Sequence, residues 1–251
     1  MILKLLSGES HPHMISLLAT FVQHDRQHLI FPCAEMNLRN FWMKFKPRTD
    51  ETGIMWFAEQ SAGIASALAR IHGPHDTGPR SSLKHLSSYQ KQINPAGRPR
   101  DPSPLRYGQH CDIKAENLLL FRPSGQAEFD DCLDDFIIKI SDFGLAGFDT
   151  SASPTQNGDE HRVEGTGAYA APEVFEGHAK VGQTRDIWAL GCVYLEFITW
   201  LLGGWDLLST FEANRKKQPG DCLKFFHNPP GGSPKVKYCI IQVRELKSLT
   251  R

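Results

Sequence analysis

Residues 107–120 read YGQHCDIKAENLLL, and this stretch decides how the rest of the chain is interpreted. It places a carboxylate at Asp112, a cation at Lys114 and an amide at Asn117, directly before an apolar run that begins at Leu118. In extended backbone, residues two apart face the same side, so we expect Asp112 and Lys114 to share one space. A carboxylate that accepts a proton, a neighbouring ammonium group and an amide oxygen suited to a hard cation together indicate phosphoryl transfer.

A second polar motif follows a strand, a turn and another strand. Residues 118–121 and 136–140 are predicted strands, because both are short and apolar, and the second is rich in β-branched residues. The second strand leads directly into the tripeptide DFG at 142–144. The acidic residues at 128–135 follow no calcium-loop pattern, so they predict a solvated hairpin tip.

Further motifs continue in a recognisable order. Residues 165–173 read GTGAYAAPE, and Asp186 opens a long apolar run. Taken together, the motifs resemble those of the protein kinase family. The matching positions are His110, Cys111, Asp112, Ile113 and Asn117 for the catalytic loop H-R-D-L-x-x-x-N, residues 142–144 for D-F-G, 171–173 for A-P-E, and 186–191 for the start of the large buried helix.

The resemblance implies a role for each polar residue. Asp112 would orient the substrate hydroxyl, and Lys114 would neutralise charge on the γ-phosphoryl group in flight. Asn117 and Asp142 would hold Mg²⁺ between them, because Mg²⁺ prefers hard oxygen ligands. Thr166 resembles the threonine that forms a hydrogen bond near the catalytic aspartate in serine/threonine kinases. ATP and Mg²⁺ are therefore the cofactors that the resemblance implies.

The same resemblance places the adenine of ATP against the segment that follows the second N-terminal strand. Phe31 and Cys33 would offer one backbone carbonyl and one N–H, and Ile30 would line the back of the pocket. Pro32 lies between them and removes only a donor that is not needed. Leu119 joins this set as a nucleotide-binding residue. From this stretch alone, an ordinary strand end is the favoured explanation of residues 31–34.

Two residues of the loop narrow the class. Lys114, two residues after the aspartate, is the serine/threonine-kinase pattern, so protein hydroxyls of Ser and Thr are the implied substrates. Cys111 stands where the family commonly has an arginine that clamps a phosphorylated activation loop. The arginine that takes part in this electrostatic switch is therefore expected to be absent at position 111.

The implied fold class is α+β, a protein-kinase-like fold. Residues 1–33 would be a remnant of the N-lobe, containing the end of the family's C helix, two strands and the hinge, and residues 34–251 would be a partial, mainly helical C-lobe. The two strands are predicted at 14–21 and 28–31, and a helix is predicted from Glu51 to His72. A basic insert at 73–106 is predicted to be a solvated segment or a docking segment.

Two expected parts of the family do not occur in this sequence. No Gly-rich phosphate loop precedes the predicted hairpin, and no V-A-I-K strand supplies a lysine for the α- and β-phosphates. Glu173 is also expected to lack its usual arginine partner, because kinases carry more helices towards the C-terminus. The sequence therefore predicts a kinase core truncated at both ends.

Composition excludes several other classes. Lys plus Arg and Asp plus Glu both number 28, so no global field favours nucleic acid or an anionic membrane surface. The six cysteines are scattered, which indicates reduced thiols in an intracellular protein, cytoplasmic or nuclear. The apolar run 187–208 has Glu196 at its middle and Gly203-Gly204 near its end, which favours a buried core helix over a membrane span.

Two competing interpretations are rejected on local grounds. Residues 165–170, GTGAYA, also fit the G-x-G-x-x-A motif of dinucleotide folds, but the preceding NGDEHRVE cannot form the buried strand that this motif requires. The His11-Pro12-His13 sequence could suggest a metal, but two histidines without further close ligands favour a turn.

The sequence therefore predicts a serine/threonine protein-kinase-like enzyme that uses ATP and Mg²⁺ on protein substrates. The alternative is a non-catalytic, pseudokinase-like protein-binding module, since the phosphate-binding lysine is missing. A third outcome is a chain without a stable fold, because missing strands would leave an unpaired sheet edge. Oligomeric state is not indicated.

Overall fold

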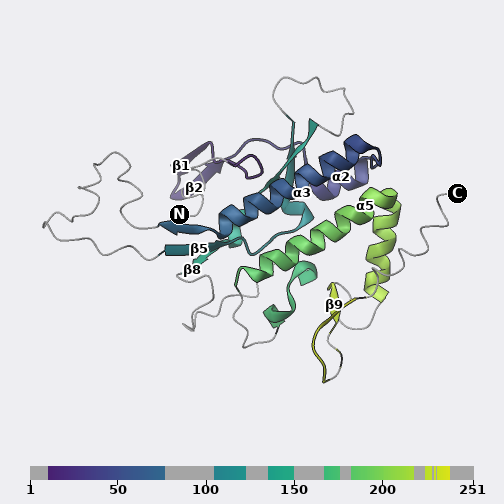
Figure 1. Ribbon diagram of the computed structural model, residues 1–251. Helices are drawn as coiled ribbons and strands as arrows, with labels where there is room; N and C mark the ends of the chain where they lie inside the picture. The colour runs from purple at the N-terminus through teal and green to yellow at the C-terminus, as the bar shows by residue number, and fades with distance from the viewer. Residues whose placement is uncertain are drawn as a thin grey trace, which may run out of the picture.

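The computed structural model describes residues 11–76, 105–122, 135–149, 167–175, 182–217, 224–227, 229 and 231–237. These residues form four small antiparallel sheets and three α-helices, so the fold class is α+β, as predicted (Figure 1). Residue Thr166, residues 77–104 of the basic insert and the acidic residues 128–134 lie outside the described residues. The division into lobes at residue 33 stays a prediction.

The first described sheet is the predicted N-terminal hairpin. Strands β1 (Ala19–Gln23) and β2 (Arg26–Ile30) pair antiparallel, and both residues of the turn, His24 and Asp25, have positive φ (49° and 58°). Positive φ at both central residues is typical of the two-residue turns that match the twist of a hairpin. The hairpin prediction is confirmed, but β1 begins at Ala19 and not at Met14.

The residues before β1 do not extend the hairpin but pair with another part of the chain. Met14 forms a parallel bridge with Ile140, and the N–H of Ile15 donates to the Ile140 carbonyl at 2.9 Å. The turn at 12–13 precedes this bridge, and Nδ1 of His13 lies 2.8 Å from the Ile138 carbonyl oxygen. These contacts hold residues 13–15 against residues 138–140, which explains why the strand starts later than predicted.

Helix α2 (Leu38–Lys44) was not predicted. It follows strand β3 (Met36–Asn37), and the side chain of Asn37 caps it by accepting a hydrogen bond from the N–H of Asn40 at 2.8 Å. The helix is short, and it buries Phe41 and Trp42 completely. Burial of these two aromatic side chains stabilises a helix that is too short to be stable alone.

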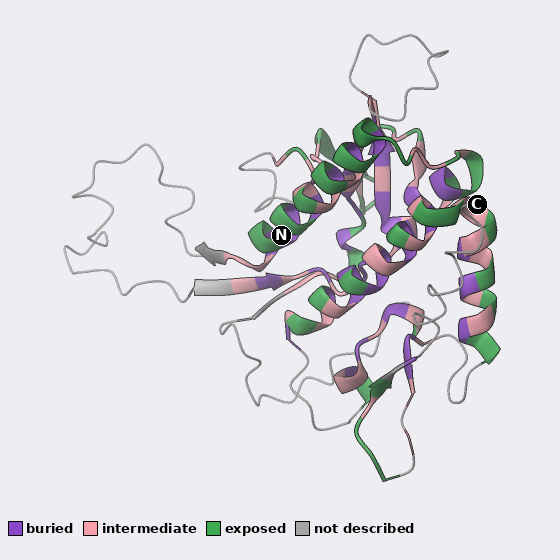
Figure 2. Cartoon of the chain, turned by 45° about the vertical axis from the view of Figure 1, so that its right-hand side comes forward, coloured by how far each residue is buried: buried purple, intermediate pink, exposed green. Residues whose placement is uncertain are grey.

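Helix α3 (Glu51–His72) has the predicted bounds. Asp50 caps it by accepting from the N–H of Gly53 at 3.0 Å. The predicted apolar face is confirmed at Ile64, Leu68 and Ile71, which are buried, and Phe57 packs edge-on against Phe197. Figure 2 shows this division of α3 into a buried and an exposed side.

Two three-stranded sheets carry the polar loops. One has the order β3-β6-β7, with β6 at Leu118–Phe121 and β7 at Ile137–Ile140, close to the two predicted strands. The other has the order β4-β5-β8, with β4 at Pro74–Asp76, β5 at Leu105–Gln109 and β8 at Gly147–Asp149. The remaining short elements are the 3₁₀ turns at Ala115–Asn117, Phe143–Leu145, Gly167–Tyr169 and Pro172–Phe175, and the strands β9 (Phe226–His227) and β10 (Lys235–Val236).

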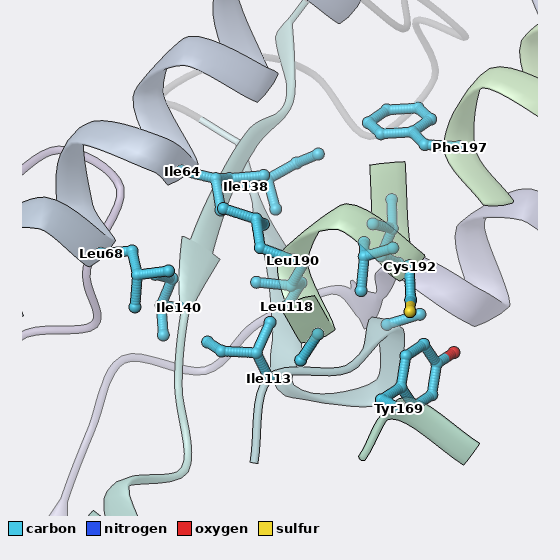
Figure 3. Close-up of a cluster of buried hydrophobic side chains, with 14 of the residues drawn as sticks. Ile64, Leu68, Ile113, Leu118, Ile138, Ile140, Tyr169, Leu190, Cys192 and Phe197 are labelled. Carbon is cyan, nitrogen blue, oxygen red and sulfur yellow. The ribbon is translucent and has the colours of Figure 1, made fainter. Parts of the chain in front are cut away.

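Helix α5 (Thr184–Lys217) crosses the core and then bends. Gly203 and Gly204 have non-helical dihedral angles, as expected from the pair of glycines, and the second half turns away from the first (Figure 1). By length and composition α5 could span a membrane, but Ala189, Leu190 and Val193 are buried in the hydrophobic core. Figure 3 shows side chains of α3, β6, β7 and α5 meeting there.

Candidate active site

Two strand pairings bring the predicted catalytic loop beside the DFG segment. Gln109 at the end of β5 pairs with Gly147 of β8, and Leu118 at the start of β6 pairs with Ile140 of β7. Residues 110–117 and 141–146 are therefore held at both ends by antiparallel neighbours. Because both ends are fixed, these two segments lie side by side.

Asp112 is the centre of the first segment. Its Oδ2 accepts a hydrogen bond from Nζ of Lys114 at 2.7 Å and another from Nδ2 of Asn117 at 2.9 Å. Nδ2 of Asn117 also donates to the Asp112 carbonyl at 2.9 Å. The shared space expected for Asp112 and Lys114 is thus present, and Asn117 joins it. Asp112 is only 9% exposed, so its carboxylate has a fixed direction.

Hydrogen bonds connect this loop to the residue before Asp142. The Asn117 carbonyl accepts from both the N–H (2.9 Å) and the hydroxyl (2.8 Å) of Ser141. Nε2 of His110 lies 2.9 Å from the Ser141 carbonyl oxygen, and its ring packs edge-on against Phe143 at 5.1 Å. Ser141 is therefore held by both ends of the catalytic loop.

The buried imidazole of His110 contacts both polar segments. Burial lowers the pKa of His110, while the carboxylates of Asp186, Asp112 and Asp142 act in the opposite direction. The N–H of Asp112 donates to Nδ1 of His110 at 3.3 Å, and Nε2 lies 2.9 Å from the carbonyl oxygen of Ser141, so the backbones of Asp112 and of the residue before Asp142 meet at one imidazole. Phe143 is buried, whereas Asp142 has φ of 59° and is exposed, so the backbone directs the carboxylate away from the core.

Asp186 at the start of α5 holds the backbone of the catalytic loop by hydrogen bonds. Its oxygens accept from the backbone N–H groups of His110 (2.7 Å) and Cys111 (2.8 Å), and Nε2 of His72 lies 2.9 Å away. Burial acts to raise the pKa of Asp186, but these hydrogen bonds outweigh it and leave the pKa below its ordinary value. Cys111 has φ of 70°, a strained value for a cysteine, which the two bonds to Asp186 stabilise.

The residues predicted to bind the nucleotide base occupy the link between the hairpin and the helices. Ile30 ends β2 and is 44% exposed, and Cys33 is also exposed. The N–H of Glu35 then donates to the Leu120 carbonyl at 3.0 Å, so the link containing Phe31 runs towards β6. Leu119 lies on β6, half-buried. The structure thus brings the end of this link to the strand that carries Leu119.

The segment after Thr166 is anchored on α5. Tyr169 donates from its hydroxyl to Oε2 of Glu196 at 2.7 Å, and both side chains are buried. Glu173 of the A-P-E motif accepts a hydrogen bond from the Thr184 hydroxyl at 3.1 Å. Thr166 itself lies outside the described residues, so its role stays a prediction.

Sequence reasoning missed the role of Glu196. The residue was noted only as a charge inside an apolar run, whereas the structure places it on the buried side of α5. Burial raises the pKa of Glu196 to about 7, although the Tyr169 hydroxyl and the Arg215 guanidinium act to lower it. An ionisable residue at the centre of an apolar helix was the available signal, and its two partners could not be found without the fold.

Comparisons with known proteins agree with the motif order. A family model described as "Protein kinase domain" matches residues 109–203. Mitogen-activated protein kinase kinase kinase 20 of Arabidopsis thaliana is 30% identical over 164 residues, which cover 55% of this chain and 44% of that protein. Human cyclin-dependent kinase-like 4 is 36% identical over 198 residues, which cover 78% of this chain and 38% of that protein.

Among solved structures, the crystal structure of the yeast RNA Pol II CTD kinase CTDK-1 complex aligns with a TM-score of 0.47 and 19% identity. The alignment covers 77% of this chain and 47% of that one. This chain spans less than half the length of the two curated relatives.

The paired loops lie within residues 109–203, the part of the chain that matches the protein kinase domain. The chain belongs to the eukaryotic-type protein kinase family. The curated relatives named above are protein kinases, of which this chain spans less than half. The predictions made from the order of the motifs, for the family and for the fold class, are therefore confirmed.

Proposed function

We propose that this chain, or the protein of which it is part, transfers the γ-phosphoryl group of ATP to serine or threonine hydroxyls of a protein substrate. Asp112 orients the substrate hydroxyl and accepts its proton, and Lys114 stabilises charge on the transferred group. Thr166 lies near Asp112 in this proposal. The adenine ring contacts Ile30, Phe31, Cys33 and Leu119.

The observation that carries the proposal is the convergence on Oδ2 of Asp112. Lys114 and Asn117 both donate to this one oxygen, at 2.7 Å and 2.9 Å. A carboxylate held by two donors keeps one orientation, which is what positioning an incoming hydroxyl requires. The ammonium group of Lys114 at the same place supplies positive charge where a phosphoryl group would arrive.

The residues present also fit a magnesium ion. The amide nitrogen of Asn117 donates to Asp112, which turns the amide oxygen away from that carboxylate. Asp142 offers an exposed carboxylate next to Ser141, which Asn117 binds through its backbone. An amide oxygen and a carboxylate are hard ligands of the kind that Mg²⁺ prefers, and bound Mg²⁺ would neutralise phosphate charge.

The test separates nucleotide binding from phosphoryl transfer. Thermal unfolding is measured with ATP and Mg²⁺, with ATP and EDTA, and with Mg²⁺ alone. A ligand at a hundred times its Kd adds ~2.7 kcal/mol to the free energy of unfolding, so a Mg²⁺-dependent increase is readily seen. Phosphate incorporation is then measured on peptides that differ only in carrying Ser, Thr or Tyr.

Three aspartate variants sharpen this test. Asp142→Asn is expected to abolish the Mg²⁺-dependent stabilisation, whereas Asp112→Asn keeps it and lowers transfer at least ~100-fold. Asp206→Asn, at an exposed position on α5, is the matched control and changes neither. Stabilisation that does not depend on Mg²⁺, or transfer to Tyr peptides alone, would contradict the proposal.

A chain that shows neither ATP-dependent stabilisation nor transfer would instead fit the non-catalytic protein-binding module.

The proposal also places the protein inside the cell, in the cytoplasm or nucleus. Cys33, Cys111 and Cys192 are free thiols in the described part of the chain, which supports a reducing compartment. Fractionation of cells that produce the full-length protein tests this location.

A further inference from the structure

The C-terminal hairpin is a part of the fold that the proposed function does not use. β9 and β10 pair antiparallel, and the N–H of Lys237 donates to the Phe225 carbonyl at 2.9 Å. Phe225 and Phe226 are almost completely buried, at 3% and 2% exposure. In Figure 1 this hairpin lies beside the first half of α5, next to the short turns that contain the A-P-E motif.

The buried phenylalanines contact the segment 167–175 directly. The Phe225 ring lies 5.9 Å from that of Tyr169, and the Phe226 ring lies 6.1 Å from that of Phe175. Nζ of Lys224 is 3.2 Å from the centre of the Phe175 ring. Aromatic pairs and cation–π contacts at these distances are attractive, so the hairpin holds both ends of the segment.

Arg215 connects the hairpin to the buried carboxylate. Its guanidinium lies 3.9 Å from the centre of the Phe225 ring, and Nη2 is 3.6 Å from Oε1 of Glu196. The other oxygen of Glu196 accepts from the Tyr169 hydroxyl. The Arg215 carbonyl in turn accepts from Nζ of buried Lys237. Arg215, near the end of α5, thus contacts the hairpin and Glu196, which lies in the first half of the same helix. Through Glu196, Arg215 is connected to the segment that begins at Gly167.

We propose that the hairpin of residues 224–227 and 231–237 is a strap, and that Arg215 is a positioning residue that fastens it. The strap fixes the segment 167–175, and thereby the approach of the protein substrate to Asp112. The part that concerns substrate rests on the proposed function. The strap itself rests only on the contacts among Arg215, Glu196, Tyr169 and the two phenylalanines.

The position of the segment explains why the strap would act on the substrate. Residues 167–175 follow Thr166 directly, and Glu173 is tied to Thr184 at the first turn of α5. In the same turn Arg185 donates to the Cys111 carbonyl at 3.2 Å, one residue before Asp112. A displacement of residues 167–175 is therefore expected to move the catalytic loop through the start of α5. The residues at 30–33 that are proposed to contact the adenine lie on another part of the chain.

Hydrogen exchange of the whole chain tests the strap without requiring activity. Phe225→Leu, Lys224→Met and Arg215→Met each remove one of its contacts. Each is expected to speed amide exchange in residues 167–175 at least tenfold and to leave α3 unchanged. Phe45→Leu is the matched control, because Phe45 is a half-buried residue that caps the C-terminus of α2 and packs on Phe41 and Phe136.

The possible results separate the strap from a general loss of stability. Faster exchange confined to 167–175 supports the strap, and Arg215→Lys is expected to restore part of the protection, because it keeps the charge beside Glu196. Unchanged exchange in 167–175, or equal acceleration in 167–175 and α3, overturns it. Phe45→Leu should accelerate exchange outside this segment only.

Kinetics address the substrate role separately. In an active protein, Arg215→Met should raise KM for the protein substrate at least tenfold and leave the Kd for Mg²⁺–ATP within twofold. An unchanged KM overturns the substrate role, even if the exchange result supports the strap. If the unmodified protein binds no nucleotide, the proposed function fails while the exchange result still decides the strap.

Discussion

Replacement of Gly63 by alanine tests how the N-terminal segment is attached to the helices. Gly63 lies in the middle of α3, and the His13 ring lies against its backbone. A Cβ at position 63 would overlap three atoms of that ring, so the ring has to leave its place. The ring is also bound to the Ile138 carbonyl through Nδ1 at 2.8 Å, and a displaced ring loses this bond.

Two opposing contributions determine the expected change in the free energy of unfolding. Loss of the bond between His13 and Ile138 costs about 1 kcal/mol. Alanine in place of glycine within a helix contributes about 1 kcal/mol of stabilisation. Gly63→Ala alone is therefore expected to leave global stability nearly unchanged. In a His13→Ala background there is no ring to displace, so the same substitution should stabilise by about 1 kcal/mol.

Urea unfolding of the four proteins of this double-mutant cycle measures the difference directly. The expected coupling between positions 13 and 63 is about 1 kcal/mol. Hydrogen exchange adds a local readout, because the bridge between Met14 and Ile140 should lose protection in Gly63→Ala. If Gly63→Ala stabilised both backgrounds equally, the His13 ring would not occupy the place next to Gly63, and the reasoning would be refuted.

Three further predictions concern single side chains. Glu196→Gln should remove a pH dependence of the free energy of unfolding. The shift of the Glu196 pKa from 4.5 to about 7 corresponds to about 3 kcal/mol of stability, which is present below pH 4.5 and is lost as the pH rises to 7. Urea unfolding of both proteins at pH 5 and pH 8 should therefore show this change in the difference between their free energies of unfolding. Asn37→Ala should lower the free energy of unfolding by about 1 kcal/mol by removing the cap of α2, and an effect near zero would contradict that role. Asp186→Asn places an amide against the N–H groups of His110 and Cys111, so chemical denaturation should report a loss of about 3 kcal/mol, and full stability would contradict the hydrogen bonds described.

Local sequence signals were sufficient for α3 and for the existence of the N-terminal hairpin, although not for the start of β1. Asp50 provides a cap, apolar residues recur at helical spacing, and Gly73 ends the helix, so every cue lies within the element itself. The strands β6 and β7 were found for the same reason. Asp112, Lys114 and Asn117 could also be placed together from their spacing, because a short loop leaves them little freedom to separate.

Other features depend on residues far apart in the sequence. Helix α2 is only seven residues long, and its burial against Trp200 and Phe136 stabilises it more than its own periodicity does. The pairing of β5 with β8 joins strands separated by about forty residues, and neither strand has a marked alternation. The strap was missed because Phe225 and Phe226 lie in a stretch rich in Pro and Gly, where no periodic pattern marks burial.

Helix α5 carries two buried carboxylates, and their opposite pKa shifts follow from the number of donors that face each. Asp186 and Glu196 are 1% and 0% exposed, so burial opposes ionisation at both. Asp186 has two fixed backbone N–H donors and His72, and it remains ionised. Glu196 has the Tyr169 hydroxyl and a guanidinium at 3.6 Å, with Arg39 and Glu212 also acting on it.

Asp186, which binds the backbone of the catalytic loop, should therefore keep its charge across the neutral pH range. Glu196, which faces Arg215 of the strap, should change its charge within that range. Protonation of Glu196 removes the charge that faces Arg215, and it leaves the bonds of Asp186 to residues 110 and 111 intact. A pH change from 8 to 6 is thus expected to alter exchange at 167–175, after correction for intrinsic rates, without altering it at 110–117. Glu196→Gln should abolish the difference, and a persisting difference would assign it to another group.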